Sequence, residues 1–399
     1  MSDVYAPECW KPTTLAGIVS LVRTKFSPSP NDTEIRCVNL EDMPEASGGL
    51  SGWSSAAENL SIKTAFKRGD ILFGKLRPYL RKYALAPFDG VCTTEVLAFR
   101  TVDGVHPPYA FQVVASDAFI EHNVGASYGT KMPRTDWKTA AAFPLMLPPL
   151  DDQRRIADLL SAVDEQVALT DATVAKESVL VKGLMQARIP EGFRIDSPLD
   201  GSLADALHTI EAGKSFMCSD KPATEGQWGV LKVSAVRPTG FDNAENKLVE
   251  DLTLVNSRYE VRQGDLLITR ANTPELVGAA CLVDAPQSKL LLCDKTLRLV
   301  PKEEAVAAYL WLWLQTPVVR RHVDAHATGT SAGMKNIGQS SLRRIPLCLP
   351  SPEEQTSRAA PVLAQLAHIR ELRAVAHKLR NIKAGLMADL LTGPPRTAA

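Results

Sequence analysis

The chain has 399 residues, of which 45% are hydrophobic, and this is enough to build two or three domains with apolar cores. The 45 basic and 45 acidic residues balance, so the total charge does not indicate a nucleic-acid-binding protein, although a neutral total can hide a local basic patch. Average glycine and proline contents exclude collagen-like and low-complexity proteins, and seven scattered cysteines without a Cys-x-x-Cys pair favour reduced thiols over disulfides or a zinc knuckle.

The beginning of the chain does not resemble a targeting segment. Residues 1–10 include Asp3, Pro7 and Glu8 and lack an apolar core. The longest apolar stretch, Ala305–Leu314, is about half as long as a membrane span requires. We therefore expect a soluble protein of the cytoplasm.

The first part of the chain predicts short strands followed by one long helix. Apolar runs bounded by Gly, Asp and Pro, such as Asp70–Phe73 and Val96–Phe99, are typical of strands. This stretch closes with Phe143–Leu150. The helix begins after Pro148-Pro149 and ends before Pro190, which gives a length of roughly 58 Å at 1.5 Å per residue. Its apolar stripe, at spacings of three and four, consists of Ile156, Leu160, Val163, Val167, Val174, Val181 and Leu184.

The second part of the chain repeats this plan. Phe143–Pro148 aligns with Ile345–Pro350, and the same offset of 202 positions places Gln153 on Gln355. Six short matches between the two parts of the chain, not all at this offset, occur in the same order. We therefore infer a tandem duplication of a half-molecule. The second long helix ends before Gly393, and its apolar stripe consists of Val362, Leu366, Ile369, Leu372, Ala376, Leu379, Leu386 and Leu390.

The long helices decide the predicted architecture. Each has an apolar stripe on one side, so we expect the two helices to pack against each other as an antiparallel pair; the alternative is that each covers its own sheet. The predicted fold class is α+β, with two pseudo-symmetric mixed α/β domains separated by an antiparallel two-helix coiled-coil rod. Such a molecule is suited to reading something bipartite.

Three enzyme-like motifs are incomplete. Gly213-Lys214-Ser215 resembles the end of a P-loop, but the required earlier glycine is His208. His106-Pro107-Pro108-Tyr109 has histidine where amino-methyltransferases have Asn or Asp. His322 and His326 lack the glutamate of a zinc protease motif. We therefore predict no catalytic constellation and no metal site.

Two pairs of loops carry chemistry suited to nucleic acid. In the first pair, Gly74–Lys82 mixes basic groups with a tyrosine directly after a predicted strand, and Thr269–Thr273 takes the same place in the second repeat. Arginine can hold guanine edges, asparagine suits adenine, and Lys and Tyr can hold phosphates. The alternative is a solvated charged loop. The candidate DNA-binding residues here are Lys75, Arg77, Tyr79, Arg81, Lys82, Arg270, Asn272 and Thr273.

The second pair of loops, Gly125–Met132 and Ala327–Lys335, is rich in small residues. Small side chains let backbone amides approach phosphate oxygens, and a lysine in each loop adds positive charge. The candidate DNA-binding residues in and just after these loops are Tyr128, Thr130, Lys131, Arg134, Thr330, Ser331, Lys335 and Asn336.

Taken together, these features resemble the specificity (S) subunits of Type I restriction–modification systems. The motifs that carry the resemblance are Leu147–Ala157 with its weaker copy Leu349–Gln355, Gly69–Leu72 followed by Leu76–Leu80, Gly264–Ile268, and the helix ends Lys182–Met185 and Gly385–Met387. The resemblance covers nearly the whole chain. The second helix departs from the pattern at Thr356–Arg358 and Pro361.

The resemblance implies a non-catalytic DNA-specificity subunit, associated with the nucleoid when bound to DNA. It implies target-recognition domains over 1–147 and 191–349, each reading half of a bipartite site, spacer helices over 148–190 and 350–393, and a disordered tail over 394–399. It further implies two modification (methyltransferase) subunits as partners, and restriction subunits in the full complex. The chain itself would bind no cofactor, because S-adenosylmethionine, ATP and Mg belong to those partners. The alternatives are a specificity subunit of a related methylation-based phage-defence system, a self-contained restriction or modification enzyme, and a coiled-coil adaptor that binds only protein.

Overall fold

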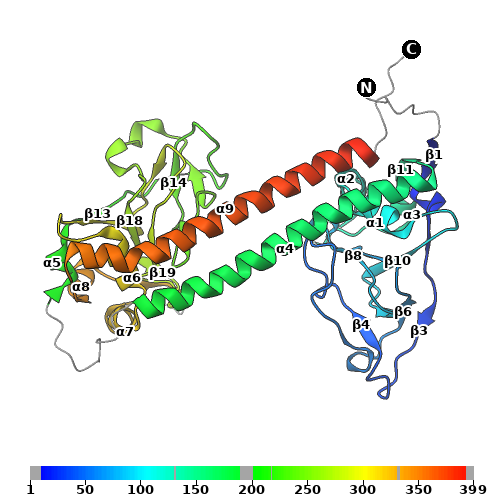
Figure 1. Cartoon of the computed structure of the whole chain (residues 1–399), viewed down its shortest axis with the longest axis horizontal. Coiled ribbons are helices and arrows are strands. Elements are labelled where there is room, and N and C mark those ends of the chain that lie inside the picture. The colour runs from blue at the N-terminus through cyan, green and yellow to red at the C-terminus, as the bar shows by residue number, and fades with distance from the viewer. Residues whose placement is uncertain (1–9, 130–131, 189–200, 217, 330–332, 392–399) are drawn as a thin grey trace, which may run out of the picture. The chain divides into compact units, whose positions relative to one another are not determined.

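The structure is a computed structural model, which describes residues 10–129, 132–188, 201–216, 218–329 and 333–391. It divides into two compact units (Figure 1). Unit 1 consists of Met1–Thr173 and Leu372–Ala399, and unit 2 consists of Val174–Glu371. Each unit combines β-sheets, short helices and one half of each of two long helices, so the mixed α/β character is confirmed.

The central sheet of unit 1 is antiparallel, with the strand order β2-β10-β7-β8. Phe73 and Phe99 stack on one face of this sheet with ring centroids 6.3 Å apart, and Phe119 meets Phe73 edge to face. These rings belong to the apolar cluster that joins the sheet to helices α1 and α2. The elements are β2 (Val19–Leu21), β7 (Ile71–Gly74), β8 (Tyr83–Leu85), β10 (Val96–Thr101), α1 (Pro107–Ala115) and α2 (Asp117–Gly125).

A second sheet of unit 1 covers the opposite face of the central sheet. Its strand order is β3-β6-β9-β4-β5, in which β4 and β9 run parallel. Leu72 and Ala98 of the central sheet share a buried cluster with Phe66 and Cys92 of the second sheet. The strands are β3 (Lys25–Phe26), β4 (Arg36–Val38), β5 (Ser54–Ser55), β6 (Lys63–Phe66) and β9 (Gly90–Cys92).

Unit 2 also combines a four-stranded central sheet with a second, smaller sheet. Its central sheet is β13-β22-β18-β20, and its second sheet, β17-β14-β21, again contains one parallel pair, β14 with β21. Trp311 and Trp313 of α6 are buried against the central sheet. The elements are β13 (Leu207–Ala212), β14 (Gly229–Leu231), β17 (Asn246–Leu248), β18 (Leu266–Thr269), β20 (Ala280–Leu282), β21 (Leu290–Leu291), β22 (Thr296–Pro301), α6 (Ala307–Leu314) and α7 (Pro317–His326).

Short elements complete both units. Two-stranded sheets pair β1 (Lys11–Thr14) with β11 (Pro144–Leu147), β12 (Gly201–Ser202) with β24 (Pro346–Leu347), β15 (Val236–Arg237) with β16 (Gly240–Phe241), and β19 (Ala271–Asn272) with β23 (Lys335–Asn336). The short helices are α3 (Trp137–Ala141), α5 (Leu203–Ala206) and α8 (Gln339–Arg343). Single 3-10 turns are η2 (Leu15–Gly17), η3 (Ala56–Glu58), η4 (Pro78–Leu80), η5 (Val233–Ala235), η6 (Leu252–Leu254) and η7 (Ser257–Tyr259).

The long helices α4 (Leu150–Arg188) and α9 (Pro352–Leu391) contact each other within each unit. In unit 1, Lys383 of α9 lies 2.6 Å from the carboxylate of Asp164 of α4. In unit 2, the side-chain amide of Gln365 donates a hydrogen bond to Glu177. Both helices also pack on the globular cores. Each helix therefore contacts the other long helix and also covers a globular core, which were the two alternatives in the sequence analysis. The unit boundaries fall inside α4 and α9, and the predicted five-segment division stays a prediction.

Cysteines and apolar helices in the described part of the chain match two expectations. The six cysteines among the described residues are free thiols, and Cys9 lies outside the described part of the chain, as does the predicted tail over 394–399. None of the described helices has both the length and the apolar character needed to cross a membrane.

Candidate nucleic-acid interface

In unit 1, the two predicted loops meet through their backbones. The N–H of Arg77 donates to the carbonyl oxygen of Pro133 at 2.7 Å. The N–H of Thr135 donates to the carbonyl oxygen of Lys75 at 2.9 Å. Tyr128 and Arg134 exchange hydrogen bonds of 3.0 and 2.9 Å. We refer to residues 75–82, 128–129 and 132–135 as the paired loops of unit 1. They form one surface at the end of β7, although a long stretch of chain lies between them.

The first of these loops has an unusual backbone. Arg77 and Arg81 flank the turn η4 with φ angles of +51° and +54°, a left-handed conformation that costs a non-glycine residue on the order of 1 kcal/mol or more. Such conformations are concentrated at binding sites, where the surrounding structure holds them. The Nε of Arg77 is buried and has no hydrogen-bond partner among the described residues. The turn presents Tyr79, whose surface is 50% exposed.

The other basic side chains of these loops are held by the protein. Arg81 forms an ion pair with Asp117, and the ammonium group of Lys82 donates to the carbonyl oxygen of Leu40 at 2.9 Å. The Nε of Arg134 lies 3.2 Å from the carboxylate of Glu95. These contacts orient the loop, and they leave Lys75, Arg77 and the exposed rings of Tyr79 and Tyr128 as the groups with the most freedom to meet a ligand.

Unit 2 builds the same surface with different side chains. β19 pairs with β23, and the N–H of Ile337 donates to the carbonyl oxygen of Arg270 at 2.9 Å, as Thr135 does to Lys75 in unit 1. Arg270 is exposed at the end of β18, and the side-chain oxygen of Asn272 accepts from the N–H of Thr273. Lys335 donates to the carbonyl oxygen of Gly329 at 3.2 Å, and Asn336 is exposed. We refer to residues 270–273, 328–329 and 333–337 as the paired loops of unit 2.

The backbone pairing places the side chains of the two units in correspondence. Lys75, Arg77, Tyr128, Arg134 and Glu95 of unit 1 match Arg270, Asn272, Thr328, Asn336 and Lys295 of unit 2. All five positions carry different side chains, and the hydrogen-bonding chemistry changes most where arginine is replaced by asparagine and where Glu95 is replaced by Lys295. The two units therefore present different side chains on one backbone framework. The remaining candidates, Thr130, Lys131, Thr330 and Ser331, lie outside the described residues.

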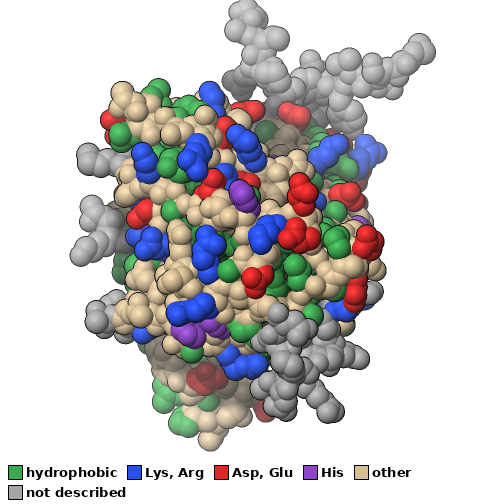
Figure 2. All heavy atoms as spheres, turned by 90° about the vertical axis from the view of Figure 1, so that its left-hand side faces the viewer, with side chains coloured by type: hydrophobic (Ala, Val, Ile, Leu, Met, Phe, Trp, Pro, Cys, Tyr) green, Lys and Arg blue, Asp and Glu red, His purple; other side chains and the backbone are tan. Residues whose placement is uncertain are grey.

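The surface charge is mixed over the face drawn in Figure 2, where Lys and Arg side chains alternate with Asp and Glu. One local concentration of positive charge nevertheless exists that the sequence did not predict. A cleft of about 340 Å³ in unit 2 is lined by four lysines, Lys214, Lys232, Lys247 and Lys295. They come from four separate segments of chain, so no local run of basic residues points to them.

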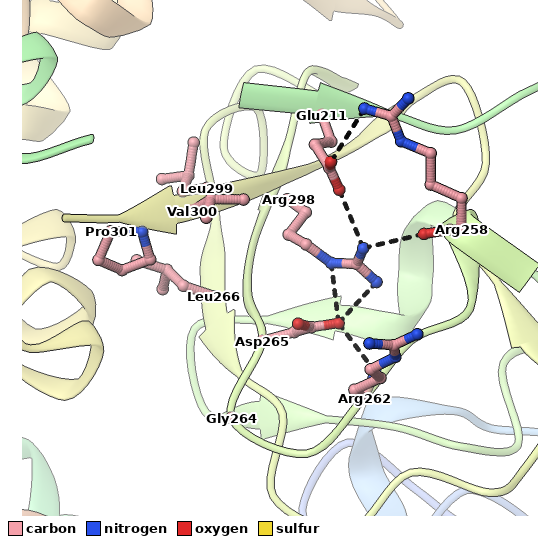
Figure 3. A pocket seen from close by; sticks show the side chains of 10 residues that line it. All are labelled: Glu211, Arg258, Arg262, Gly264, Asp265, Leu266, Arg298, Leu299, Val300 and Pro301. Atoms are coloured by element: carbon pink, nitrogen blue, oxygen red, sulfur yellow. Dashed lines mark hydrogen bonds and ion pairs between the residues drawn. The ribbon is translucent and has the colours of Figure 1, made fainter. Parts of the chain in front are cut away.

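A second polar cavity of unit 2, of about 380 Å³, is a structural ion-pair site (Figure 3). Arg298 lies between two carboxylates, with its Nε 2.9 Å from Asp265 and its Nη1 3.0 Å from Glu211. The same Nη1 donates to the carbonyl oxygen of Arg258 at 3.2 Å. Unit 1 contains the matching pair Arg100–Asp70. Because Asp265 precedes β18 and Arg270 follows it, this cavity lies at the opposite end of the strand from the paired loops.

The histidines of α7 have structural roles. His322 Nε2 lies 2.9 Å from the carbonyl oxygen of Ser341, and His122 makes the matching contact with Thr139 in unit 1. Burial lowers the pKa of His322, and this keeps its ring neutral. Among the described residues, no group of three or more His, Cys, Asp or Glu side chains is placed to hold a metal ion.

The chain is similar in sequence to known proteins. Residues 7–176 match the family model described as Type I restriction modification DNA specificity domain. The chain is 35% identical over 150 residues to the Type I restriction enzyme EcoEI specificity subunit of Escherichia coli, a match that covers 37% of this chain and 25% of that protein. It is 24% identical over 278 residues to the EcoKI specificity subunit of Escherichia coli strain K12, covering 63% of this chain and 58% of that protein.

Solved structures give a likeness in fold. The S subunit of a Type I restriction-modification system from M. genitalium superposes with a TM-score of 0.58 at 13% identity, covering 99% of this chain and 98% of that one. A chain from a study of complex assembly and conformational transition of the type I R-M system gives 0.57 at 19% identity, covering 97% and 98%. The matched segments span less than two thirds of the curated relatives, whereas the fold likeness extends over the whole chain. These findings confirm the family resemblance.

Proposed function

We propose that the chain is a specificity subunit of the Type I restriction–modification family and that it gives such a complex its DNA sequence specificity by recognising a bipartite site. One observation carries this proposal. The two units present paired loops on the same backbone framework but with different side chains. Asn272 of unit 2 takes the position of Arg77 in unit 1, and Asn336 takes that of Arg134. A site with two different halves requires such a pair of readers.

In this proposal, base recognition comes from the ends of β7 and β18. Arg77 would read a guanine edge, and Asn272 would read adenine, because these are the pairings that the major groove favours. Arg270 would also read a guanine edge, whereas Lys75 and Lys335, with the amides of the loops 125–132 and 327–335, would hold phosphates and so position each unit on the duplex. The two half-sites would lie about one helical turn apart, near 34 Å.

We further propose that α4 and α9 set the distance between the half-sites and bind two modification subunits. The contacts Lys383–Asp164 in unit 1 and Gln365–Glu177 in unit 2 support a paired-helix spacer. The modification subunits would supply S-adenosylmethionine-dependent methylation, and restriction subunits would supply ATP- and Mg-dependent cleavage. The chain itself would be non-catalytic and would act in the cytoplasm, on the DNA of the cell. A specificity subunit of a related methylation-based defence system would use the same surfaces.

The decisive experiment compares the purified chain with the assembled complex. The chain alone, incubated with DNA, Mg and S-adenosylmethionine, is expected to give no methylation and no cleavage, whereas the complex with modification subunits methylates one bipartite site. Turnover by the chain alone would establish a self-contained enzyme instead. Assembly with modification subunits that shows no affinity for DNA would establish a protein-binding adaptor.

A further inference from the structure

The lysine groove of unit 2 is a cleft of about 340 Å³ in which Lys214, Lys232, Lys247 and Lys295 gather around one acidic residue, Asp294. Lys214 follows β13, Lys232 follows β14, Lys247 lies in β17, and Lys295 precedes β22. Separate sheet segments therefore place their lysines at one cleft. Four ammonium groups near one another repel each other, and such an arrangement is favoured when an anion occupies the cleft.

Two of these lysines are neutralised by the protein and two are not. Lys247 lies 2.6 Å from the carboxylate of Asp220, and Lys232 lies 3.9 Å from that of Glu245. Lys214 is exposed, and its described contact is a cation–π contact, 5.9 Å from the centre of the Tyr259 ring. Lys295 is exposed too, and no described residue pairs with its side chain. The unneutralised charge of the groove therefore rests on Lys214 and Lys295.

The position of Lys214 is fixed by the glycine before it. A Cβ atom on Gly213 would lie 2.0 Å from the carbonyl oxygen of Leu292, so only glycine allows this close approach of the two backbones. The approach lets Lys214 form a bridge with Cys293, next to Asp294 and Lys295. Gly213-Lys214-Ser215, which lacks the earlier glycine of a P-loop, thus still places a lysine and a serine hydroxyl at a basic cleft.

The groove is continuous with the paired loops of unit 2. The N–H of Arg270 donates to the carbonyl oxygen of Lys295 at 2.8 Å. In unit 1, the matching backbone contact joins Lys75 to Glu95, and the Glu95 carboxylate pairs with Arg134. Unit 2 therefore has a lysine where unit 1 has a glutamate. The lysine adds positive charge beside the paired loops of unit 2, whose segment 270–273 has fewer basic residues than the segment 75–82 of unit 1.

We propose that the lysine groove binds the phosphate backbone of the DNA next to the half-site read by unit 2, with Lys214 and Lys295 as its contacts. This inference rests on the proposed function. Lysine holds a phosphate as a point charge and reads no base, so the groove contributes affinity and position without sequence preference. Unit 1 would take its phosphate contacts from the basic loop 75–82, and in unit 2 this groove would add to the contact from Lys335.

The test measures DNA affinity against salt concentration for the full chain assembled with modification subunits. The double variant Lys214→Gln/Lys295→Gln is expected to weaken binding to target and non-target DNA by the same factor. The slope of log K against log salt should fall by about 0.9 for each phosphate that no longer has a lysine partner. Lys295→Glu, which restores the residue type of unit 1, should weaken binding more than Lys295→Gln. The methylated sequence should stay the same in all three variants.

The matched control is Lys302→Gln, because Lys302 is exposed at the other end of the same strand, β22. It should leave both the affinity and the salt slope unchanged. If the groove variants bind DNA with the wild-type slope, or if they alter the methylated sequence, the groove inference is wrong while the proposed function stands. If the unaltered complex binds no specific site, the proposed function itself fails. Thermal unfolding of each variant confirms that the fold is intact.

Discussion

Gln153 and Gln355 make the same hydrogen bonds in the two units. The side-chain oxygen of Gln153 accepts from the N–H of His106 at 2.9 Å, and its amide donates to the carbonyl oxygen of Pro148. Gln355 accepts from Val306 at 2.7 Å and donates to Pro350 at 2.8 Å. Each glutamine therefore ties the start of a long helix to the residue before a short helix, α1 in unit 1 and α6 in unit 2, and both are fully or almost fully buried.

Replacing either glutamine should destabilise the protein. Gln153→Leu or Gln355→Leu leaves a buried backbone N–H and carbonyl oxygen without partners, at a cost of about 1–3 kcal/mol each. Urea denaturation measures the change in the free energy of unfolding. The control is Gln166→Leu, since Gln166 is exposed on α4 and should change stability by less than about 0.5 kcal/mol. Equal effects of all three substitutions would contradict the role of the buried glutamines.

The two arginine–aspartate pairs should differ in their importance. The side chain of Arg298 is 11% exposed and serves two carboxylates, whereas that of Arg100 is 42% exposed and serves one. Arg298→Met leaves Asp265 and Glu211 without their shared partner and should cost about 3–5 kcal/mol. Arg100→Met should cost less, because water screens its pair. The same denaturation experiment compares them, and a larger loss for Arg100→Met would refute this ranking.

Stability should depend on pH through His322. Its pKa is lowered in the folded protein by burial, so the unfolded chain binds a proton more readily. The stabilisation from neutral His322 is complete above the ordinary histidine pKa near 6.5 and is lost as the pH falls toward the lower, folded-state value. Thermal unfolding between pH 5 and 8 should show this loss in the wild type and a weaker one in His322→Gln. His368→Gln, at an exposed position of α9, is the control.

The paired loops should act independently on specificity. Arg77→Ala should relax the half-site read by unit 1, and Asn272→Ala the half-site read by unit 2, each by about 1–3 kcal/mol of discrimination. Arg270→Ala should likewise affect the second half alone. Sequencing of methylated sites in cells that carry each variant gives the result. Arg262→Ala, on the far side of β18, is expected to change neither half, and a variant that alters both halves would argue against separate readers.

Much of the framework could be predicted from the sequence because it depends on local patterns. The strands β7 and β18 were expected from apolar runs after Gly-Asp turns, and α4 from its apolar stripe after two prolines. The second sheets could not be predicted in this way, because several of their strands, such as β3 and β5, are only two residues long and show no alternation.

The assembly of the site depends on more than local pattern. The pairing of Leu76 with Arg134, and of Ala271 with Asn336, joins segments that are distant in sequence, and it depends on the packing of the whole unit. The ion pair of Arg81 with Asp117 and the hydrogen bond from Lys82 to the carbonyl oxygen of Leu40 likewise cannot be predicted from a run of basic residues. The lysine groove draws one residue from each of four segments.

The paired loops are joined by main-chain hydrogen bonds, as between Arg77 and Pro133 or between Ile337 and Arg270. Peptide groups are the same in every residue, so these joints do not depend on which side chains the loops carry. Mutation can therefore replace the side chains at positions such as 75, 77, 270 and 272 while the supporting architecture survives. Under the proposed function, a few substitutions would then change the DNA sequence that one unit recognises while the other unit keeps its own.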